Sequence, residues 1–304
     1  MIKHDSLNAV AMFVEAVDAG GFAMAAQRLR LSRSAVGKAI ARLEADLSTR
    51  LVHRTTRTFT LTDEGKVYYA YCVRALAQLS DARAVLDAGR GAPAGRLRVT
   101  VPTLFGRMCV TPILLQLSAR HPALSLEIFL TDQTVDLQQD GFDLAVRMGA
   151  LPDSATLAAR SLGVQKMVVC AAPAYLDQHG RPATIEALAG HSAVMYHDGQ
   201  RVSPWFMRDA QGAIMQANVR SRLHFNDLQT IADAAIAAHG LAWIPSWLAR
   251  PFVADGTLEI IVDSDTVIAS GIHALWPAAP HMPHKTRCAI DLLLAQLPSY
   301  LSDA

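Results

Sequence analysis

The segment "LSRSAVGKAIARLE", residues 31–44, carries groups that could bind a polyanion on one face of a predicted helix. Its apolar residues recur at helical spacing: Val36, Ile40, Leu43 and Leu47. The opposite face is small, hydroxylated and basic: Arg33, Ser34, Gly37, Lys38 and Ala41. Ser32 is the predicted N-cap of this helix. Guanidinium, ammonium and hydroxyl groups donate hydrogen bonds to phosphates and base edges, so the face favours nucleic-acid contact over the alternative of an ordinary solvated surface.

A second basic segment, "RLVHRTTRTFTLTDEG", follows at residues 50–65. Its β-branched, alternating part predicts a hairpin over residues 55–62 with Arg54 and Arg57 near its start. Such a hairpin suits contact with phosphates or with the minor groove, although both arginines could be ordinary surface charges. Helices predicted at 5–18 and 22–29 precede it, and a tight turn joins the second of these to the small-faced helix. This order predicts a helix-turn-helix.

A different chemistry is predicted after the strand at residues 96–101. The segment "PTLFG" there begins a helix whose free N–H groups could hold a carboxylate, which selects Thr103, Leu104 and Phe105. Arg147 ends another predicted strand, beside the cleft expected between two α/β lobes. It is a candidate for binding the ligand, and the alternative is a structural ion pair. Asn226 is the predicted cap of a helix at 227–239. Three further residues are candidates for ligand contact from the second lobe: His197, Phe225 and Pro245.

Enzymatic chemistry finds little support in the sequence. It contains no Walker-type loop, no H-E-x-x-H, no G-x-S-x-G and no His/Cys cluster with metal-ligand spacing. Four cysteines are far apart in the sequence, which argues against a disulfide or redox pair: Cys72, Cys109, Cys170 and Cys288. We therefore expect no catalytic residue, metal or cofactor. The N-terminus lacks an apolar signal segment and no 18-residue run is uninterrupted, so we expect a cytoplasmic protein without membrane contact.

The 304 residues, 51% of them apolar, are enough for several domains. Residues 1–62 hold nine Lys/Arg and five Asp/Glu, a formal charge of +4, whereas the remainder sums to −3. A long helix from residue 63 to about 88 has an apolar stripe suited to a dimer arm: Tyr69, Cys72, Leu76, Leu79 and Leu86. The linker "GRGAPAG" follows it.

Strands then alternate with helices, which predicts a mostly parallel α/β sheet in each of two lobes. The first has strands at 96–101, 124–130 and 142–148, helices near 106–119 and 133–140, and the last helix at about 285–297. The second has a strand at 166–172, a helix at 185–190 and a hairpin around residues 209–212. The predicted domains are 1–62, 63–90 and 91–304. Lobe I covers about 95–164 and 268–304, and lobe II about 165–267.

Residues 25–65 closely resemble the winged helix-turn-helix of the LysR-type transcriptional regulators, and weaker collinear similarity includes "DLAVRMG" and "GLAWIPSWL". The resemblance implies an α/β multidomain chain with a mainly α head, a long linker helix and a two-lobed, periplasmic-binding-protein-like effector domain. By position it implies these DNA contacts: Ser32, Arg33, Ser34, Gly37, Lys38, Arg54, Thr56 and Arg57. Gly37 departs from the serine that is usual there.

The implied function is sequence-specific regulation of transcription in response to a small, anionic effector bound between the lobes. The implied partners are double-stranded promoter DNA, the effector, and further copies of the chain in a homodimer or homotetramer, with RNA polymerase as a further candidate. The alternative is an α/β solute-binding or catalytic module with a non-specific nucleic-acid anchor. Sequence selectivity of DNA binding would separate the two.

Overall fold

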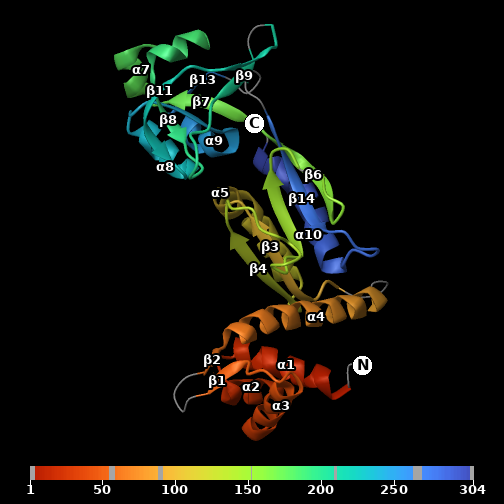
Figure 1. Cartoon of the computed structure of the whole chain (residues 1–304). Coiled ribbons are helices and arrows are strands. Elements are labelled where there is room, and N and C mark those ends of the chain that lie inside the picture. The colour runs from red at the N-terminus through yellow and green to blue at the C-terminus, as the bar shows by residue number, and fades with distance from the viewer. Residues whose placement is uncertain are drawn as a thin grey trace. The chain divides into compact units, whose positions relative to one another are not determined.

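The computed structural model describes residues 4–54, 59–87, 92–151, 153–208, 211–262 and 269–301 (Figure 1). The chain divides into two compact units, Met1–Arg96 with Asp136–Gly141, and Leu97–Val135 with Phe142–Ala304. Within the described ranges, no single helix is long and apolar enough to cross a membrane. One pair of helices, Leu7–Asp18 and Phe22–Leu29, meets the length and composition test only when taken together across a 119° bend.

Three helices and a two-stranded wing form the head of the first unit: α1 His4–Asp18, α2 Phe22–Leu29, α3 Arg33–Asp46, β1 Val52–Arg54 and β2 Phe59–Leu61. The three predicted helices are confirmed, and Ser32 caps α3 by accepting a hydrogen bond from the Ala35 N–H at 3.1 Å. The predicted hairpin at 55–62 was placed too late, because β1 pairs as Val52↔Leu61 and residues 55–58 lie outside the described part of the chain. Val52 is only 2% exposed. Because its side chain packs in the core of the head, the first wing strand begins at Val52, before the Thr-rich segment.

The apolar stripe of α3 lies in the core of this head. Val36, Ile40 and Phe13 are fully buried together with Leu51, which precedes the wing. The stripe predicted from helical spacing therefore faces inward as far as Leu43, whereas Leu47 is 38% exposed at the end of the helix.

The long helix α4, Asp63–Asp87, begins where the sequence predicts (Figure 1). The Thr62 hydroxyl caps it by accepting from the Gly65 N–H at 2.9 Å. Gly65 is needed because a Cβ there would lie 2.0 Å from the Leu51 carbonyl oxygen. The first part of the predicted stripe packs on the head, since Cys72 is buried and the Tyr69 hydroxyl donates to Asp18.

The second unit contains two five-stranded sheets. The first has the order β4-β3-β5-β14-β6: β3 Gly95–Val101, β4 Leu124–Leu130, β5 Leu144–Met148, β6 Leu157–Gln165 and β14 Ser270–Pro277. Its helical segments are α5 Thr103–Phe105, the π-helical η1 Gly106–Val110, α6 Thr111–Arg120 and α10 His284–Leu301. The buried Lys285 ammonium pairs with Asp143 at 3.1 Å, which ties α10 to the start of β5.

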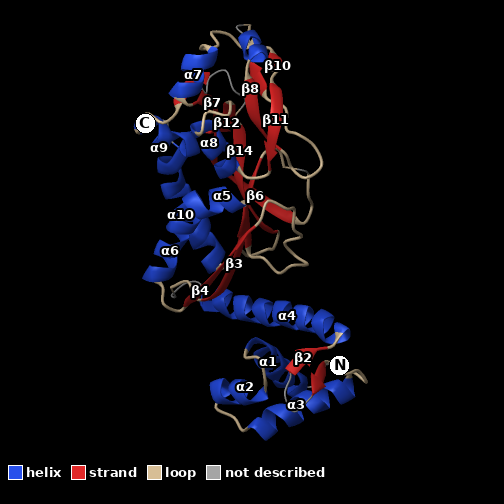
Figure 2. Cartoon of the chain, turned by 90° about the vertical axis from the view of Figure 1, so that its left-hand side faces the viewer, coloured by secondary structure: helices blue, strands red, loops and turns tan. Residues whose placement is uncertain are grey.

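The second sheet has the order β11-β8-β12-β7-β13: β7 Met167–Ala171, β8 Ser192–Tyr196, β11 Arg220–Phe225, β12 Leu241–Pro245 and β13 Glu259–Val262. The predicted hairpin is confirmed as the antiparallel pair β9 Phe206–Arg208 and β10 Ile214–Gln216, which forms a two-stranded sheet of its own. The helices of this part are α7 Pro173–His179, the 3₁₀ helix η2 Glu186–Gly190, α8 Leu228–Ile236 and α9 Ser246–Ala254. Figure 2 shows α8 and α9 beside these strands. The chain passes between the sheets after Gln165 and again between Val262 and Ser270.

Both sheets are mixed, so the prediction of mostly parallel sheets was wrong. Strand β3 is parallel to β5, but β14 runs antiparallel to both β5 and β6. In the second sheet β8 is parallel to β11 and β12, whereas β7 is antiparallel to β12 and β13. The reversals involve the strands where the chain leaves or enters a sheet, and β6 was not predicted at all. No local pattern shows the direction of such a strand.

The helix predicted near 133–140 is absent, and turns occupy the segment. The Asp136 carboxylate accepts from the N–H groups of Gln138 and Gln139 at 2.9 Å each, and Gly141 follows with φ +69°. A side chain that bonds the backbone in this way competes with a helix. By contrast, the last helix is longer than predicted, because it continues through Pro298 to Leu301 and the Arg250 guanidinium bonds the Tyr300 carbonyl at 2.8 Å.

Candidate nucleic-acid interface and ligand cleft

The outer face of α3 carries the basic and hydroxyl groups that the sequence singled out. Arg33, Ser34 and Lys38 are exposed, and the Ser34 hydroxyl lies 3.0 Å from that of the N-cap Ser32. A Cβ on Gly37 would meet nothing within 4 Å, so the surface beside it is open. These five residues are brought together on one side of a helix whose other side is core.

The predicted wing contacts are less fully described. Arg54 ends β1, but its side chain is not described, and Thr56 and Arg57 lie outside the described residues. The wing is joined to α3 by Glu44, which is 6% exposed. Its Oε1 accepts from the N–H groups of Leu51 and Val52 at 2.9 and 3.2 Å. One carboxylate therefore sets the position of β1 relative to α3.

Replacing Gly37 by alanine is expected to raise the free energy of unfolding of the head by about 0.5–1 kcal/mol. Glycine in a helix interior costs about that much relative to alanine, and the added Cβ has open space. Thermal unfolding followed by circular dichroism checks this. Gly65→Ala is a control of opposite sign, because its Cβ would meet the Leu51 carbonyl. An unchanged or lowered unfolding temperature for Gly37→Ala would contradict the prediction.

A cleft of about 460 Å³ lies where strands of the second unit end. Residues at or just after the ends of β3, β4 and β5 line part of it: Pro102, Leu104, Phe105, Thr131, Asp132, Gln133, Thr134, Arg147 and Met148. Residues at or just after the ends of β6, β8, β11 and β12 complete it: Gln165, Tyr196, Asn226, Asp227, Leu228 and Trp247. Carboxyl ends of strands are the usual place for ligands in α/β sheets, and the volume falls in the range of about 300–1,000 Å³ of small-molecule sites.

Arg147 is the cation of this cleft. Its Nη2 donates to the buried Thr100 hydroxyl at 3.0 Å and its Nη1 to the Val146 carbonyl at 2.9 Å. Burial lowers the pKa of Arg147, and the charge of Asp132 opposes that shift. Because Thr100 has no exposed surface, the guanidinium is held in a fixed position. These two hydrogen bonds supply a structural role for this arginine, and among the described residues it forms no salt bridge.

The N–H of Thr103 is already bonded, contrary to the prediction that it is free. It donates to Asp132 Oδ1 at 3.1 Å, so a carboxylate of the chain itself occupies that position. The helical turn α5 also spans only three residues before the chain becomes π-helical. Leu104 and Phe105 line the cleft, as predicted, whereas Thr103 does not.

The second-lobe predictions fall close to the cleft, with mixed outcomes. Asn226 lines it but does not cap α8, because the Asp227 carboxylate accepts from the Thr230 N–H at 2.7 Å. Three other predicted residues are outside the lining: His197, Phe225 and Pro245. His197 accepts from the Gly199 N–H through Nδ1, Phe225 packs on the core, and Pro245 is buried at the end of β12.

Among the cleft residues that sequence reasoning missed are those that follow β4 and Tyr196 at the end of β8. Burial and the negative charges of Asp132, Asp198 and Asp227 raise the pKa of Tyr196, so Tyr196 lies near carboxylates of both lobes. The rule that ligands meet the carboxyl ends of strands, applied to the predicted strand at 124–130, would have selected Asp132. Tyr196 ends a strand that was not predicted.

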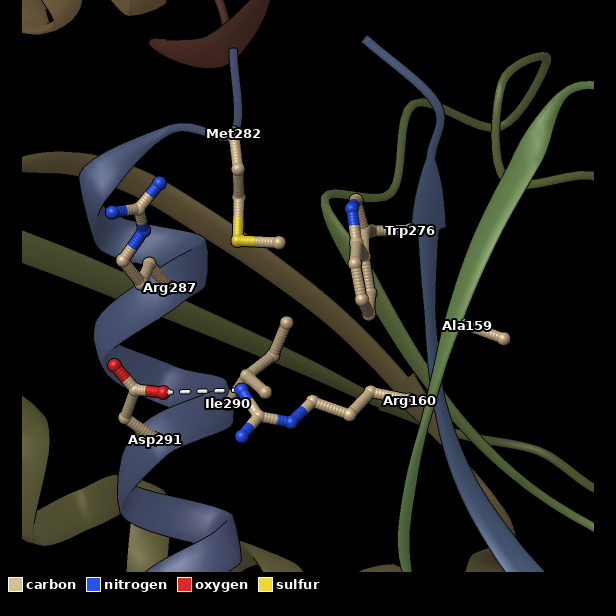
Figure 3. Close-up of a pocket in the computed structure, with 7 residues that line it drawn as sticks. All are labelled: Ala159, Arg160, Trp276, Met282, Arg287, Ile290 and Asp291. Carbon is tan, nitrogen blue, oxygen red and sulfur yellow. Dashed lines mark ion pairs between the residues drawn. The ribbon is translucent and has the colours of Figure 1, made fainter. Parts of the chain in front are cut away.

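A second cavity of about 390 Å³ lies between α10 and strands β6 and β14. Figure 3 shows Met282 and Ile290 between α10 and the Trp276 ring, with the Arg160 side chain reaching across to Asp291. That ion pair measures 3.6 Å, and both side chains are more than half exposed. Arg287 also lines this cavity, whose charged groups therefore sum to +1.

Comparisons with known proteins agree along the whole chain. Residues 7–66 match the family model "Bacterial regulatory helix-turn-helix protein, lysR family", and residues 90–298 match "LysR substrate binding domain". A transcriptional regulator from Xanthomonas campestris is 31% identical over 300 residues, which cover 97% of this chain and 86% of the relative. A transcriptional repressor from Pseudomonas aeruginosa is 30% identical over 95% of this chain and 92% of its own length.

Solved structures show the same architecture. The full-length virulence activator AphB of Vibrio cholerae has a TM-score of 0.59 at 26% identity, covering 97% of this chain and 99% of AphB. The predicted fold class is thereby confirmed: an N-terminal helix-turn-helix head followed by a two-lobed α/β regulatory domain.

Proposed function

The chain belongs to the LysR family of transcriptional regulators, and we propose that it binds promoter DNA through α3 and the wing under the control of a small molecule in the cleft. Regulators of this family are not enzymes, so the alternative of a catalytic module on a nucleic-acid anchor loses its main support. The observation that carries the proposal is the outer face of α3, which is exposed, small and basic. Such a helix can enter the major groove.

The DNA interface divides into a reading part and a positioning part. Arg33, Ser34 and Lys38 with the open surface at Gly37 face base edges and nearby phosphates, and Ser32 sets the start of the helix. On the wing, Arg54, Thr56 and Arg57 contact phosphates or the minor groove. The formal charge of +4 on residues 1–62 supports this division.

Self-association through α4 places two heads on one operator. Large apolar side chains remain exposed on this helix: Val67, Tyr71 and Leu79. Its 25 residues span about 37 Å at 1.5 Å per residue, a length suited to a paired helical arm. The proposed assembly is a homodimer or homotetramer. Each chain has a head at 1–62, a linker helix at 63–90 and an effector domain at 91–304. The assembly acts in the cytoplasm, with RNA polymerase as a further partner.

The cleft supplies the control. A ligand that binds one arrangement of the two lobes more tightly shifts the population toward that arrangement, and through the oligomer changes how the heads meet DNA. Support comes from the position of the cleft at strand ends of both lobes and from the fixed guanidinium of Arg147.

Fluorescence anisotropy tests the proposal. The full chain is titrated into the duplex from upstream of its own gene and into a scrambled duplex of equal length, at several salt concentrations. We expect about a thousandfold or greater preference for the first duplex, and a linear fall of log affinity with log salt. Equal affinity for both duplexes would refute sequence-specific regulation and leave only a non-specific anchor.

A further inference from the structure

The charges that line the cleft do not suit a simple anion. By formal charge its lining holds one cation, Arg147, and two carboxylates, Asp132 and Asp227, which sum to −1. The second cavity, by comparison, sums to +1. A small carboxylate alone would therefore meet more negative than positive charge in the cleft, whereas a ligand with one negative and one positive group would match both.

In each of the two carboxylates, one oxygen accepts hydrogen bonds from the chain. Asp132 uses Oδ1 for the Thr103 N–H, and Asp227 uses Oδ1 for the N–H and hydroxyl of Thr230. The second oxygen of each has no hydrogen bond within the described part of the chain. Asp132, Asp227 and Tyr196 line the same cleft, Asp132 from lobe I and the other two from lobe II. The charges of both carboxylates help to raise the pKa of Tyr196. An ammonium group there would gain two charge-assisted acceptors.

The remaining lining is apolar and aromatic. Phe105 and Trp247 meet edge to face with ring centroids 5.6 Å apart, and further apolar residues join them: Pro102, Leu104, Met148 and Leu228. An aromatic wall attracts cations as well as apolar groups. The cleft thus offers a guanidinium for a carboxylate, carboxylates for an ammonium and an apolar wall for a third substituent.

We propose that the cleft binds a zwitterionic amino acid with an apolar side chain, its carboxylate on Arg147 and its ammonium between Asp132 and Asp227. This inference rests on the proposed effector role of the cleft. It differs from the simple anion that the sequence predicted, because the backbone N–H group expected to hold that anion already bonds Asp132.

Three probes that share one phenyl ring and differ in charge test the assignment on the full chain: L-phenylalanine, 3-phenylpropionate and 2-phenylethylamine. Binding is measured by isothermal titration calorimetry and by the shift in unfolding temperature. L-leucine, 4-methylpentanoate and 3-methylbutylamine form a second set with an aliphatic body. In at least one set, we expect the amino acid to bind at least tenfold more tightly than either singly charged analogue.

Three variants test the site, one in the cleft and two outside it. Asp132→Asn is expected to weaken the amino acid at least tenfold and to strengthen the matching carboxylate, a gain that misfolding cannot produce. Asp233→Asn, an exposed carboxylate on α8 outside the lining, is the matched control and should change neither. Arg287→Ala, in the second cavity, should leave amino-acid binding unchanged.

Tighter binding of the carboxylate than of the amino acid in both sets would overturn the zwitterion assignment and leave the regulator proposal intact. Binding of none of the six probes would also overturn it, and promoter binding measured by anisotropy would still judge the regulator separately. Loss of amino-acid binding in Arg287→Ala with retention in Asp132→Asn would place the ligand in the second cavity and refute the proposed site.

Discussion

Replacing both Arg33 and Lys38 by alanine is expected to weaken binding to the cognate duplex by about a hundredfold or more. Both side chains are exposed on the outer face of α3, so their removal leaves the core unchanged. An arginine that reads a base contributes about 1–3 kcal/mol and a lysine–phosphate contact adds to it, and about 1.4 kcal/mol corresponds to a factor of ten. Fluorescence anisotropy at several salt concentrations measures the loss, which should include a salt slope reduced by about one or two.

A charge-matched control separates contact from bulk electrostatics. Arg28→Ala with Lys66→Ala removes the same charge from the first unit, and each of these side chains sits in a surface ion pair, with Glu15 and Asp63 respectively. We expect this control to change affinity for the cognate duplex by only a few fold. Similar losses for the two double variants would mean that charge, and not the α3 face, determines binding.

The head could be predicted largely from sequence because its determinants are local. Helical spacing placed Val36 and Ile40 inward, and a serine before the first turn predicted the cap that Ser32 makes. The predicted start of the long helix at residue 63 is also confirmed, with Thr62 as its cap. Where a buried tertiary contact decided the outcome, it failed: Val52 lies in the core, so the wing strand begins before the Thr-rich segment.

The cleft was predicted only in part because its residues meet through strand order. Arg147 lies at the end of a strand that the pattern predicted, Leu104 and Phe105 follow another, and all three line the cleft. Asp132 also follows a predicted strand, at 124–130, but the helix expected directly after it, near 133–140, is replaced by turns around Asp136. The choice between Asn226 and Asp227 as the cap of α8 needed one residue of precision, which periodicity does not provide.

Glu44 has a structural role that the sequence alone does not indicate. In the sequence it ends the segment "ARLE". In the structure its buried carboxylate satisfies two consecutive N–H groups, those of Leu51 and Val52, at the point where the chain turns from α3 into the wing. Arg50 lies 3.9 Å from the other oxygen but is mostly exposed, so this ion pair adds little to the two backbone contacts.

Replacing Glu44 by alanine is therefore expected to lower the free energy of unfolding of the head by about 2–5 kcal/mol. Two buried N–H groups would lose their acceptor, and each unsatisfied group costs about 1–3 kcal/mol. Calorimetry of the full chain should show the first unit melting earlier, and amide hydrogen exchange should show lost protection at Leu51 and Val52. DNA affinity should fall as well, because β1 would no longer be held against α3.

Glu44→Gln provides the matched comparison, since its amide oxygen can still accept from both N–H groups while the charge is removed. We expect it to retain most of the protection and of the DNA affinity. If glutamine were as damaging as alanine, the negative charge and not the pair of hydrogen bonds would hold the wing. If neither variant changed exchange at Leu51, the wing would be positioned by the apolar contacts of Val52 alone, and the proposed link from α3 through Glu44 to the wing would fail.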